Sequence, residues 1–249
     1  MKPPQGMVTM RVYVRLFGLA AALSFAPAAQ AQLFEEPKRE KGPPRVFFGG
    51  DFLIAVPTGQ FANYVDNGFG VGAHVLWQFD DPGIMALRLD GNLMIYGHET
   101  FNVPLSPTTP RIRVDVTTNN NIGSVHIGPQ LMVPNGQFRP YVNAGFGFSN
   151  FFTYSSVEGS RDEEPFASST NYSDFIWSWT AGGGIYIPVS RRGTPVSIDL
   201  SARYHRNGQT RYLREGSIIE DGTGDIDYEP IQSETNLLVY QIGISVGVR

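Results

Sequence analysis

Ser124 and His126 are the first candidates for chemistry in this sequence. In an extended strand, side chains two residues apart lie on the same face, so a serine hydroxyl and an imidazole base would be neighbours. A lipid-modifying enzyme built on this pair would also need an acid to orient the histidine. The alternation of the segment points both side chains inward, away from lipid chains, which favours interior hydrogen bonding. We therefore predict no catalytic residue and no cofactor.

Two glycine runs and one aspartate run are the other candidates for ligand binding. Gly145-Phe146-Gly147 and Gly182-Gly183-Gly184 are followed by no Lys-Ser/Thr and lie within strand patterns, so they are thin strand positions and not phosphate loops. The segment from Asp221 to Asp227 offers oxygen ligands for calcium but lacks EF-hand spacing, which favours a solvated acidic loop. The chain has no cysteine. No metal site is predicted.

The elements that carry these residues are strands. Polar and apolar residues alternate with a period of two in eight runs, and nothing after Arg45 has helical spacing. Beyond the N-terminal segment no run of eighteen apolar residues occurs, which excludes a helical membrane protein. The predicted strands are 45–56, 68–79, 84–97, 121–133, 139–154, 174–189, 195–206 and 235–248.

The connections between these strands alternate in length. Short turns rich in Pro, Gly, Asn and Asp occupy 80–83, 134–138 and 190–194, whereas the remaining connections are long: 57–67, 98–120, 155–173 and 207–234. Short turns at one end and long loops at the other are typical of outer-membrane barrels. The sequence therefore predicts an all-β protein, an eight-stranded antiparallel up-and-down transmembrane β-barrel.

The two faces of the predicted strands differ in composition. One face is almost purely apolar, and the other carries glycine and small polar residues without a lysine or glutamate. A soluble lipocalin-type barrel, the alternative, would place Lys and Glu on its water-facing side, so the apolar face is predicted to meet lipid. Aromatic residues near the strand ends are expected to form two interfacial girdles: Trp77 and Phe79 at the short-turn end, and Trp177, Trp179, Tyr204 and Tyr240 toward the long loops.

The polar face is expected to form a paired network inside the barrel. An eight-stranded barrel is just wide enough for side chains to fill. Charges held away from water need partners, so Arg88 and Arg203 are predicted to face the three aspartates, and no continuous water channel is expected. The predicted interior residues are Asp51, His74, Arg88, Asp90, His126, Asp199 and Arg203.

The N-terminal region is expected to lie outside the barrel. Residues 1–31 combine basic residues, an apolar run and the small-residue box Ala29-Gln30-Ala31, which is typical of a secretory signal peptide. Residues 32–44 are charged and proline-bearing, so we expect a disordered periplasmic leader, followed by the barrel domain over 45–249. Removing the signal takes three of 19 basic residues and none of the 23 acidic ones, leaving a net charge of −7. Nucleic acid is not an expected partner.

The run from Arg139 to Phe148, the run from Thr180 to Ile185 and the C-terminal strand resemble the outer-membrane protein β-barrel superfamily of small OmpA-like and OmpW-like barrels. The resemblance covers residues 45–249 and implies outer-membrane lipid and the barrel-assembly machinery as partners. The assembly signal that it implies consists of Gln241, Gly243, Val246 and Val248. This chain ends on Val248 and Arg249, where the family usually has an aromatic residue.

Location is better specified than role. We expect a non-enzymatic protein of the Gram-negative outer membrane, with a structural role or a surface partner reached through the long loops. The alternative is a small channel or conduit for apolar or small solutes, as the OmpW-like resemblance implies. The third hypothesis is a lipid-modifying enzyme that depends on Ser124 or His126.

Overall fold

The computed structural model describes residues 45–104, 113–159, 165–190, 194–214, 216–220 and 226–248. They belong to one compact unit within residues 41–249. The predicted signal peptide and leader lie outside the described residues, and so does most of the acidic segment 221–227. No helix within the described ranges has the length and apolar character needed to cross a membrane.

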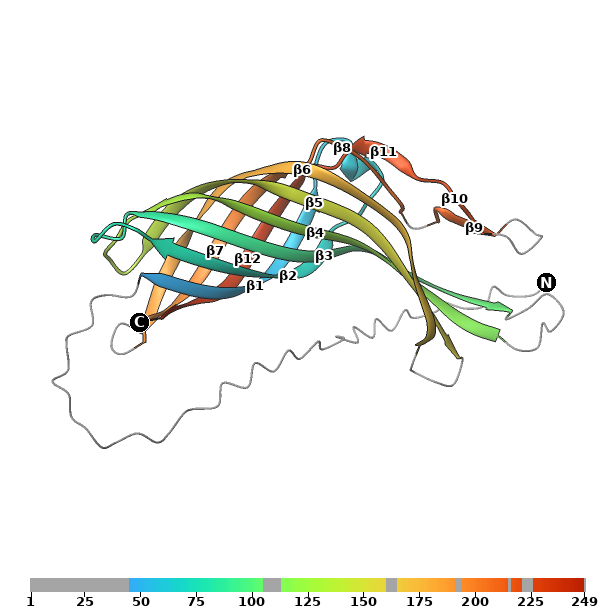
Figure 1. Ribbon diagram of the computed structural model, residues 1–249, viewed down its shortest axis with the longest axis horizontal. Coiled ribbons are helices and arrows are strands. Elements are labelled where there is room, and N and C mark those ends of the chain that lie inside the picture. The colour runs from blue at the N-terminus through green and yellow to red at the C-terminus, as the bar shows by residue number, and fades with distance from the viewer. Residues whose placement is uncertain are drawn as a thin grey trace, which may run out of the picture. The chain divides into compact units, whose positions relative to one another are not determined.

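Eight antiparallel strands close into a barrel, in the order β1-β12-β7-β6-β5-β4-β3-β2 (Figure 1). The last strand pairs with the first, from Val46 opposite Val248 to Pro57 opposite Leu237, so the barrel has no open edge along this seam. The predicted all-β fold with eight antiparallel strands is confirmed. The barrel strands are β1 (Val46–Pro57), β2 (Gly68–Gln78), β3 (Met85–Pro104), β4 (Arg113–Met132), β5 (Arg139–Gly159), β6 (Pro165–Ser190), β7 (Val196–Arg206) and β12 (Leu237–Val248).

Four of the strands are longer than the sequence predicts. The predicted loops 98–120 and 155–173 are mostly strand, since β3 pairs with β4 as far as Pro104 opposite Arg113, and β5 pairs with β6 as far as Glu158 opposite Pro165. Figure 1 shows β3 to β6 running well past the other four strands. We call this part, residues 97–104, 113–121, 152–159 and 165–174, the extended wall. Its apolar residues, such as Phe101, Val114 and Val116, are outnumbered by Thr, Asn and Ser, so the apolar alternation is weaker here than in the rest of the barrel.

Hydroxyl side chains support the pairing in the extended wall. The Thr100 and Thr117 hydroxyls lie 3.2 Å apart across β3 and β4, and the Thr118 and Ser155 hydroxyls lie 2.8 Å apart across β4 and β5. Such cross-strand pairs stabilise a sheet without burial of apolar surface. The strands therefore continue where the hydrophobic pattern stops.

The remaining elements lie in the connections. A single turn of 3-10 helix, η1 (Phe61–Asn63), follows β1. The connection after β7, predicted as one loop, contains β8 (Gln209–Tyr212) paired with β11 (Ile231–Glu234), and β9 (Ile218–Glu220) paired with β10 (Ile226–Tyr228). Both pairings are antiparallel.

The short turn between β2 and β3 is built by Asp80 and Gly83. The Asp80 carboxylate accepts hydrogen bonds from the backbone N–H groups of Ile84 and Met85, both at 2.8 Å, while Gly83 adopts φ +74°. This positive φ favours glycine, and aspartate is common in turns because its side chain can accept hydrogen bonds from nearby backbone N–H groups. The turn thereby fixes the register between β2 and β3.

Candidate functional site

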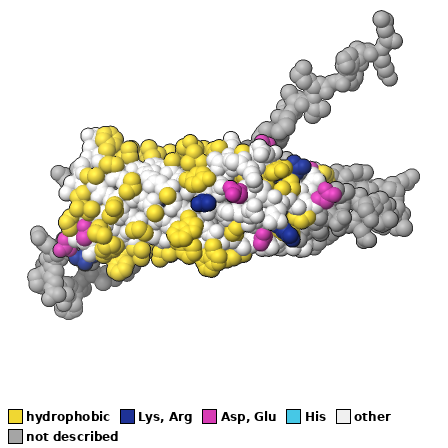
Figure 2. All heavy atoms as spheres, turned by 90° about the horizontal axis from the view of Figure 1, so that it is seen from above, with side chains coloured by type: hydrophobic (Ala, Val, Ile, Leu, Met, Phe, Trp, Pro, Cys, Tyr) yellow, Lys and Arg dark blue, Asp and Glu magenta, His cyan; other side chains and the backbone are white. Residues whose placement is uncertain are grey.

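The outside of the barrel is covered by exposed apolar side chains. Val71, Val142 and Ile242 are 60%, 61% and 55% exposed, respectively, although they lie within regular strands. Figure 2 shows hydrophobic side chains gathered over the barrel, with a few charged side chains at its middle and toward its ends. Water-soluble monomers rarely expose so large an apolar surface. We call this surface the apolar belt; it includes Phe48, Phe52, Phe69, Val71, Leu89, Leu93, Ile127, Leu131, Val142, Ile185, Ile242 and Ile244.

The predicted girdle aromatics lie on this outer surface. Trp77 and Phe79 make an edge contact at 6.5 Å near the end of β2. Trp177 stacks on Phe146 with ring centroids 5.3 Å apart, and Trp179 contacts the same ring at 4.5 Å. Tyr204 and Tyr240 are also exposed. Their assignment to membrane interfaces stays a prediction.

Asp90 is the centre of a buried charge network inside the barrel. Arg88 Nε lies 2.8 Å from Asp90 Oδ1, and Arg203 Nη1 lies 2.8 Å from Asp90 Oδ2. Arg88 also donates to the Tyr186 hydroxyl at 2.8 Å. Arg88 and Arg203, both buried, thus share the single negative charge of the Asp90 carboxylate.

The other two interior aspartates have different partners. Asp51 Oδ2 lies 2.8 Å from His74 Nδ1, so its close partner is a histidine and not the arginine expected from the sequence. Asp199 accepts a hydrogen bond from the Tyr141 hydroxyl at 2.7 Å and a longer one from Arg88 Nη1 at 3.4 Å. The pairing of Arg88 with Asp199 agrees with the sequence interpretation. The pairing of Asp51 with His74 was missed, because period two fixes only the face and not the partner across strands.

Glycines on the inner face make room for these side chains. A methyl group on Gly49 would clash with the His74 ring, and one on Gly182 would clash with the backbone next to Arg203 and with its side chain. Gly243 lies between Asp51 and Asp199 in the sheet, being paired with both. These absent side chains let the charged groups of neighbouring strands converge in the barrel centre.

His126 does not pair with Ser124, contrary to the enzyme hypothesis. Its Nε2 lies 2.7 Å from the Ser178 hydroxyl of β6, whereas Ser124 contacts the Asn92 amide at 3.3 Å. Ser178 continues to Ser149 at 3.1 Å, and His126 Nδ1 has no hydrogen-bond partner among the described residues. His126 and Ser178 are both buried, and no carboxylate bonds to His126 Nδ1 to orient the ring. This is a poor arrangement for nucleophilic catalysis. The sequence signal that was available is the polar position of Ser178 on the inner face of β6.

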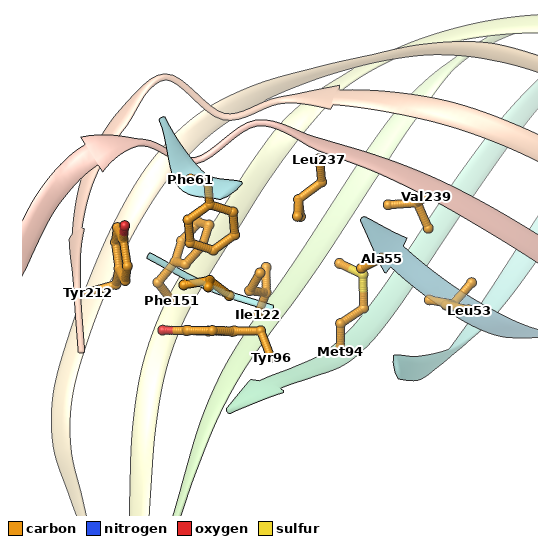
Figure 3. Packing of buried hydrophobic residues seen from close by; sticks show 11 residues of the cluster. Leu53, Ala55, Phe61, Met94, Tyr96, Ile122, Phe151, Tyr212, Leu237 and Val239 are labelled. Carbon is orange, nitrogen blue, oxygen red and sulfur yellow. The ribbon is translucent and has the colours of Figure 1, made fainter. Parts of the chain in front are cut away.

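An aromatic cluster closes the barrel at the end that carries η1 and β8. Phe61 of η1 is fully buried there, with ring centroids 5.0 Å from Tyr212, 5.7 Å from Tyr96 and 6.1 Å from Phe151 (Figure 3). We call it the mouth cluster; it consists of Leu53, Ala55, Phe61, Val65, Met94, Tyr96, Ile122, Phe151, Tyr212, Leu237 and Val239. It fills the interior above the charge network with apolar side chains.

The connection after β7 is fastened to the barrel wall over this cluster. Tyr96 donates its hydroxyl to the Leu213 carbonyl at 2.9 Å, and Glu99 Oε2 accepts the Gly216 N–H at 3.0 Å. Asp174 accepts hydrogen bonds from the Thr210 hydroxyl and the Arg211 N–H. Burial raises the pKa of Tyr212 above its usual value, so this phenol is neutral beside Ser233. Through Tyr212 and Phe61, the elements β8 and η1 are thus part of the packed interior.

A second apolar cluster closes the opposite end of the barrel. It consists of Leu76, Ala86, Met132, Tyr141 and Tyr186, with Phe47 packed against it. Tyr141 and Tyr186 stack at 4.7 Å and direct their hydroxyls to Asp199 and Arg88. The interior is therefore layered: an apolar cluster at each end and a charged layer between them.

The C-terminal residues singled out for assembly also have interior contacts. Gln241 accepts hydrogen bonds from the Ser201 hydroxyl at 2.9 Å and from Arg203 Nη2 at 2.6 Å. Gly243 provides the space for Asp51, and Val246 and Val248 alternate with the inward residues of β12. Packing thus accounts for Gln241 and Gly243, and the assembly signal stays a prediction.

Comparison with known proteins finds likeness of fold only. No family model matches the chain. No curated protein matches it either. Among solved structures, Neisserial surface protein A is 11% identical with a TM-score of 0.47, covering 84% of this chain and all of that one. The outer membrane protein OprG from Pseudomonas aeruginosa is 13% identical with a TM-score of 0.48, covering 84% of this chain and 98% of its own.

Ail of Yersinia pestis is 14% identical with a TM-score of 0.41, covering 83% of this chain and 98% of its own. The resemblance to small outer-membrane barrels expected from the sequence is confirmed at the level of fold by the closed eight-stranded barrel.

Proposed function

We propose that this chain is a non-enzymatic integral protein of the bacterial outer membrane, with a structural or surface-interaction role in the cell envelope. The observation that carries the proposal is the combination of an apolar belt outside with a filled, charged and glycine-lined interior. This is the reverse of a soluble barrel, whose apolar residues face inward. In a membrane, lipid acyl chains would contact these exposed apolar side chains in place of water.

A closed interior favours this role over that of a channel. Arg88, Arg203 and Phe61 are among the largest fully buried side chains, and they lie in layers that a solute would have to cross. Opening a path would separate buried ion pairs and apolar contacts at the same time, which is costly. The barrel is therefore proposed to conduct no ions in its ground state.

The extended wall is proposed to carry the surface role. It projects beyond the apolar belt as paired strands, which hold side chains more rigidly than a flexible loop. Its described exposed side chains are mostly polar and uncharged, with Phe101 and Tyr154 among them. His98 contacts Asn119 at 2.7 Å, and the Thr100 and Thr117 hydroxyls pair beside them. A polar, rigid surface of this kind suits hydrogen bonding to a partner at the cell surface.

Cysteine labelling in intact cells tests this orientation. The chain contains no cysteine, so a single introduced thiol reports without background. With a membrane-impermeant maleimide, Thr100→Cys in the extended wall is expected to react in intact cells, and Asp81→Cys in a short turn only after permeabilisation. Ile242→Cys in the apolar belt is expected to react only after detergent extraction and unfolding. Equal reaction of all three in a soluble fraction would contradict the proposal.

Conductance in planar bilayers separates the two remaining roles. The folded barrel is expected to leave the bilayer silent. Steady, protein-dependent current steps would overturn the closed-interior part of the proposal and favour the small channel or conduit instead.

A further inference from the structure

The charge layer inside the barrel is unevenly balanced. Its buried groups, among the described residues, include three carboxylates and two guanidinium groups, so it carries one negative charge more than positive when the histidines are neutral. Both arginines are centred on Asp90, at 2.8 Å each. Asp199 has Arg88 Nη1 only at the longer distance of 3.4 Å, and the close partner of Asp51 is His74.

Asp51, His74 and Asp199 come together in this under-compensated part of the layer. Each offers one ligand atom, and these atoms all lie within 4.8 Å of one another. The three residues come from β1, β2 and β7, and Gly243 of β12 separates the two aspartates in the sheet. A Cβ at Gly243 would collide with the Asp51 carboxylate, so the missing side chain leaves room for Asp51 to lie close to Asp199.

Two atoms of this cluster lack partners. Asp51 Oδ1 and His74 Nε2 are buried without a hydrogen bond, and the Asp51 and His74 side chains are only 2% and 0% exposed. A buried carboxylate oxygen that bonds to nothing is costly, and two neighbouring carboxylates repel each other. A bound cation would remove both penalties.

We propose that Asp51, His74 and Asp199 form a site for one divalent transition-metal ion inside the barrel. One imidazole nitrogen and two carboxylates are a donor set that suits Zn²⁺, Mn²⁺ or Co²⁺. Bonds of about 2.0–2.2 Å to a common ion place tetrahedral ligand atoms roughly 3.4 Å apart, so separations of up to 4.8 Å need to shrink by at most about 1.4 Å. The dication balances the two carboxylates, while Arg88 and Arg203 remain on Asp90.

The surroundings of the site fit a structural ion. Tyr141 donates its hydroxyl to Asp199 Oδ1 at 2.7 Å, which fixes the orientation of one ligand from outside the cluster. The apolar clusters at both ends of the barrel close the routes to the site. The ion is therefore acquired during folding and exchanges slowly afterwards. It joins β1 and β2, which are consecutive, to β7, which lies far along the chain.

Metal content of the folded chain tests the proposal. The protein is produced in zinc-supplemented cells, purified folded from membranes, washed with EDTA and measured by elemental analysis. The expected result is about one zinc per chain, released only on unfolding. Refolding in Co²⁺ instead is expected to give visible absorption bands of the bound ion.

Variants locate the ion. Asp51→Asn and His74→Gln are expected to lower the zinc content at least tenfold. His126→Gln, another buried histidine, and His98→Gln, an exposed one, are the matched controls and are expected to retain it. An unboiled gel shows whether each variant is folded.

Three results would overturn the proposal. The first is a folded wild-type barrel with less than a tenth of a zinc per chain and no cobalt bands. The second is zinc that the Asp51 and His74 variants retain. The third is zinc that the His98 control loses. If the cluster variants fail to fold, the wild-type zinc content and cobalt spectrum decide the matter by themselves.

Discussion

The strongest energetic prediction concerns the ion pair of Asp90 and Arg203. Arg203 donates to both oxygens of Asp90, at 2.8 and 2.9 Å, and Arg88 donates to the same carboxylate at 2.8 Å. Asp90→Asn leaves two buried guanidinium groups without their shared anion. Breaking a buried pair on one side costs about 3–5 kcal/mol, which lowers the folding equilibrium constant by roughly a hundredfold to a few thousandfold.

A double-mutant cycle measures the coupling between the two residues. The variants Asp90→Asn, Arg203→Gln and the double variant are unfolded in urea from lipid vesicles, with tryptophan fluorescence as the signal. We expect the double variant to lose at least 1 kcal/mol less than the sum of the single losses, since no uncompensated charge is created.

The exposed pair of Arg45 and Asp81 is the control. Its atoms lie 2.6 Å apart, but the side chains are 59% and 88% exposed, so Asp81→Asn is expected to cost less than about 1 kcal/mol. Losses for the two interior variants that add within about 0.5 kcal/mol, or single losses as small as that of the control, would refute the reasoning about the interior network.

Three further predictions concern packing and the lipid-facing surface. Phe61→Ala is expected to lower the free energy of unfolding by up to about 3–5 kcal/mol in urea, because it empties the centre of the mouth cluster, while the bilayer stays silent; an unchanged midpoint would contradict this. Gly147→Ala is expected to abolish the heat-modifiable band, because a Cβ there would clash with the Val125 carbonyl, whereas Gly91→Ala, with open space around it, folds normally; equal behaviour of the two would show that the close approach is unimportant. Ile242→Arg in the apolar belt is expected to cost about 2–4 kcal/mol in vesicles, and Thr100→Arg in the extended wall about zero; equal costs would argue against lipid contact.

The barrel could be predicted from the sequence because its two faces have such different compositions. Alternation of residues such as Phe69, Val71 and Ala73 with Gly70 and Gly72 fixes both the strand and the side of the sheet. The alternation of short and long connections then fixes the topology. The same patterns say nothing about strand ends, so β3 to β6 were predicted too short where hydroxyl and amide side chains replace apolar ones.

The interior could be predicted only in part. Polar residues on the inner face identify Arg88, Asp90 and Arg203 as interior groups, since no other face can hold them. The pairing of Asp51 with His74, and of His126 with Ser178, depends on the register between strands and on glycines that let side chains cross over their neighbours. Burial of Phe61 depends on how a loop folds back into the barrel, and a local pattern of three residues does not contain that information.

The most direct test of an integral barrel is electrophoresis of the protein from a purified outer-membrane fraction, with and without boiling. We predict that the unboiled protein remains in that fraction and migrates differently from the boiled chain, because a closed barrel resists unfolding by detergent at room temperature. A protein that appears in the soluble periplasmic fraction and runs at the same position before and after boiling would contradict the lipid-facing assignment of the apolar belt.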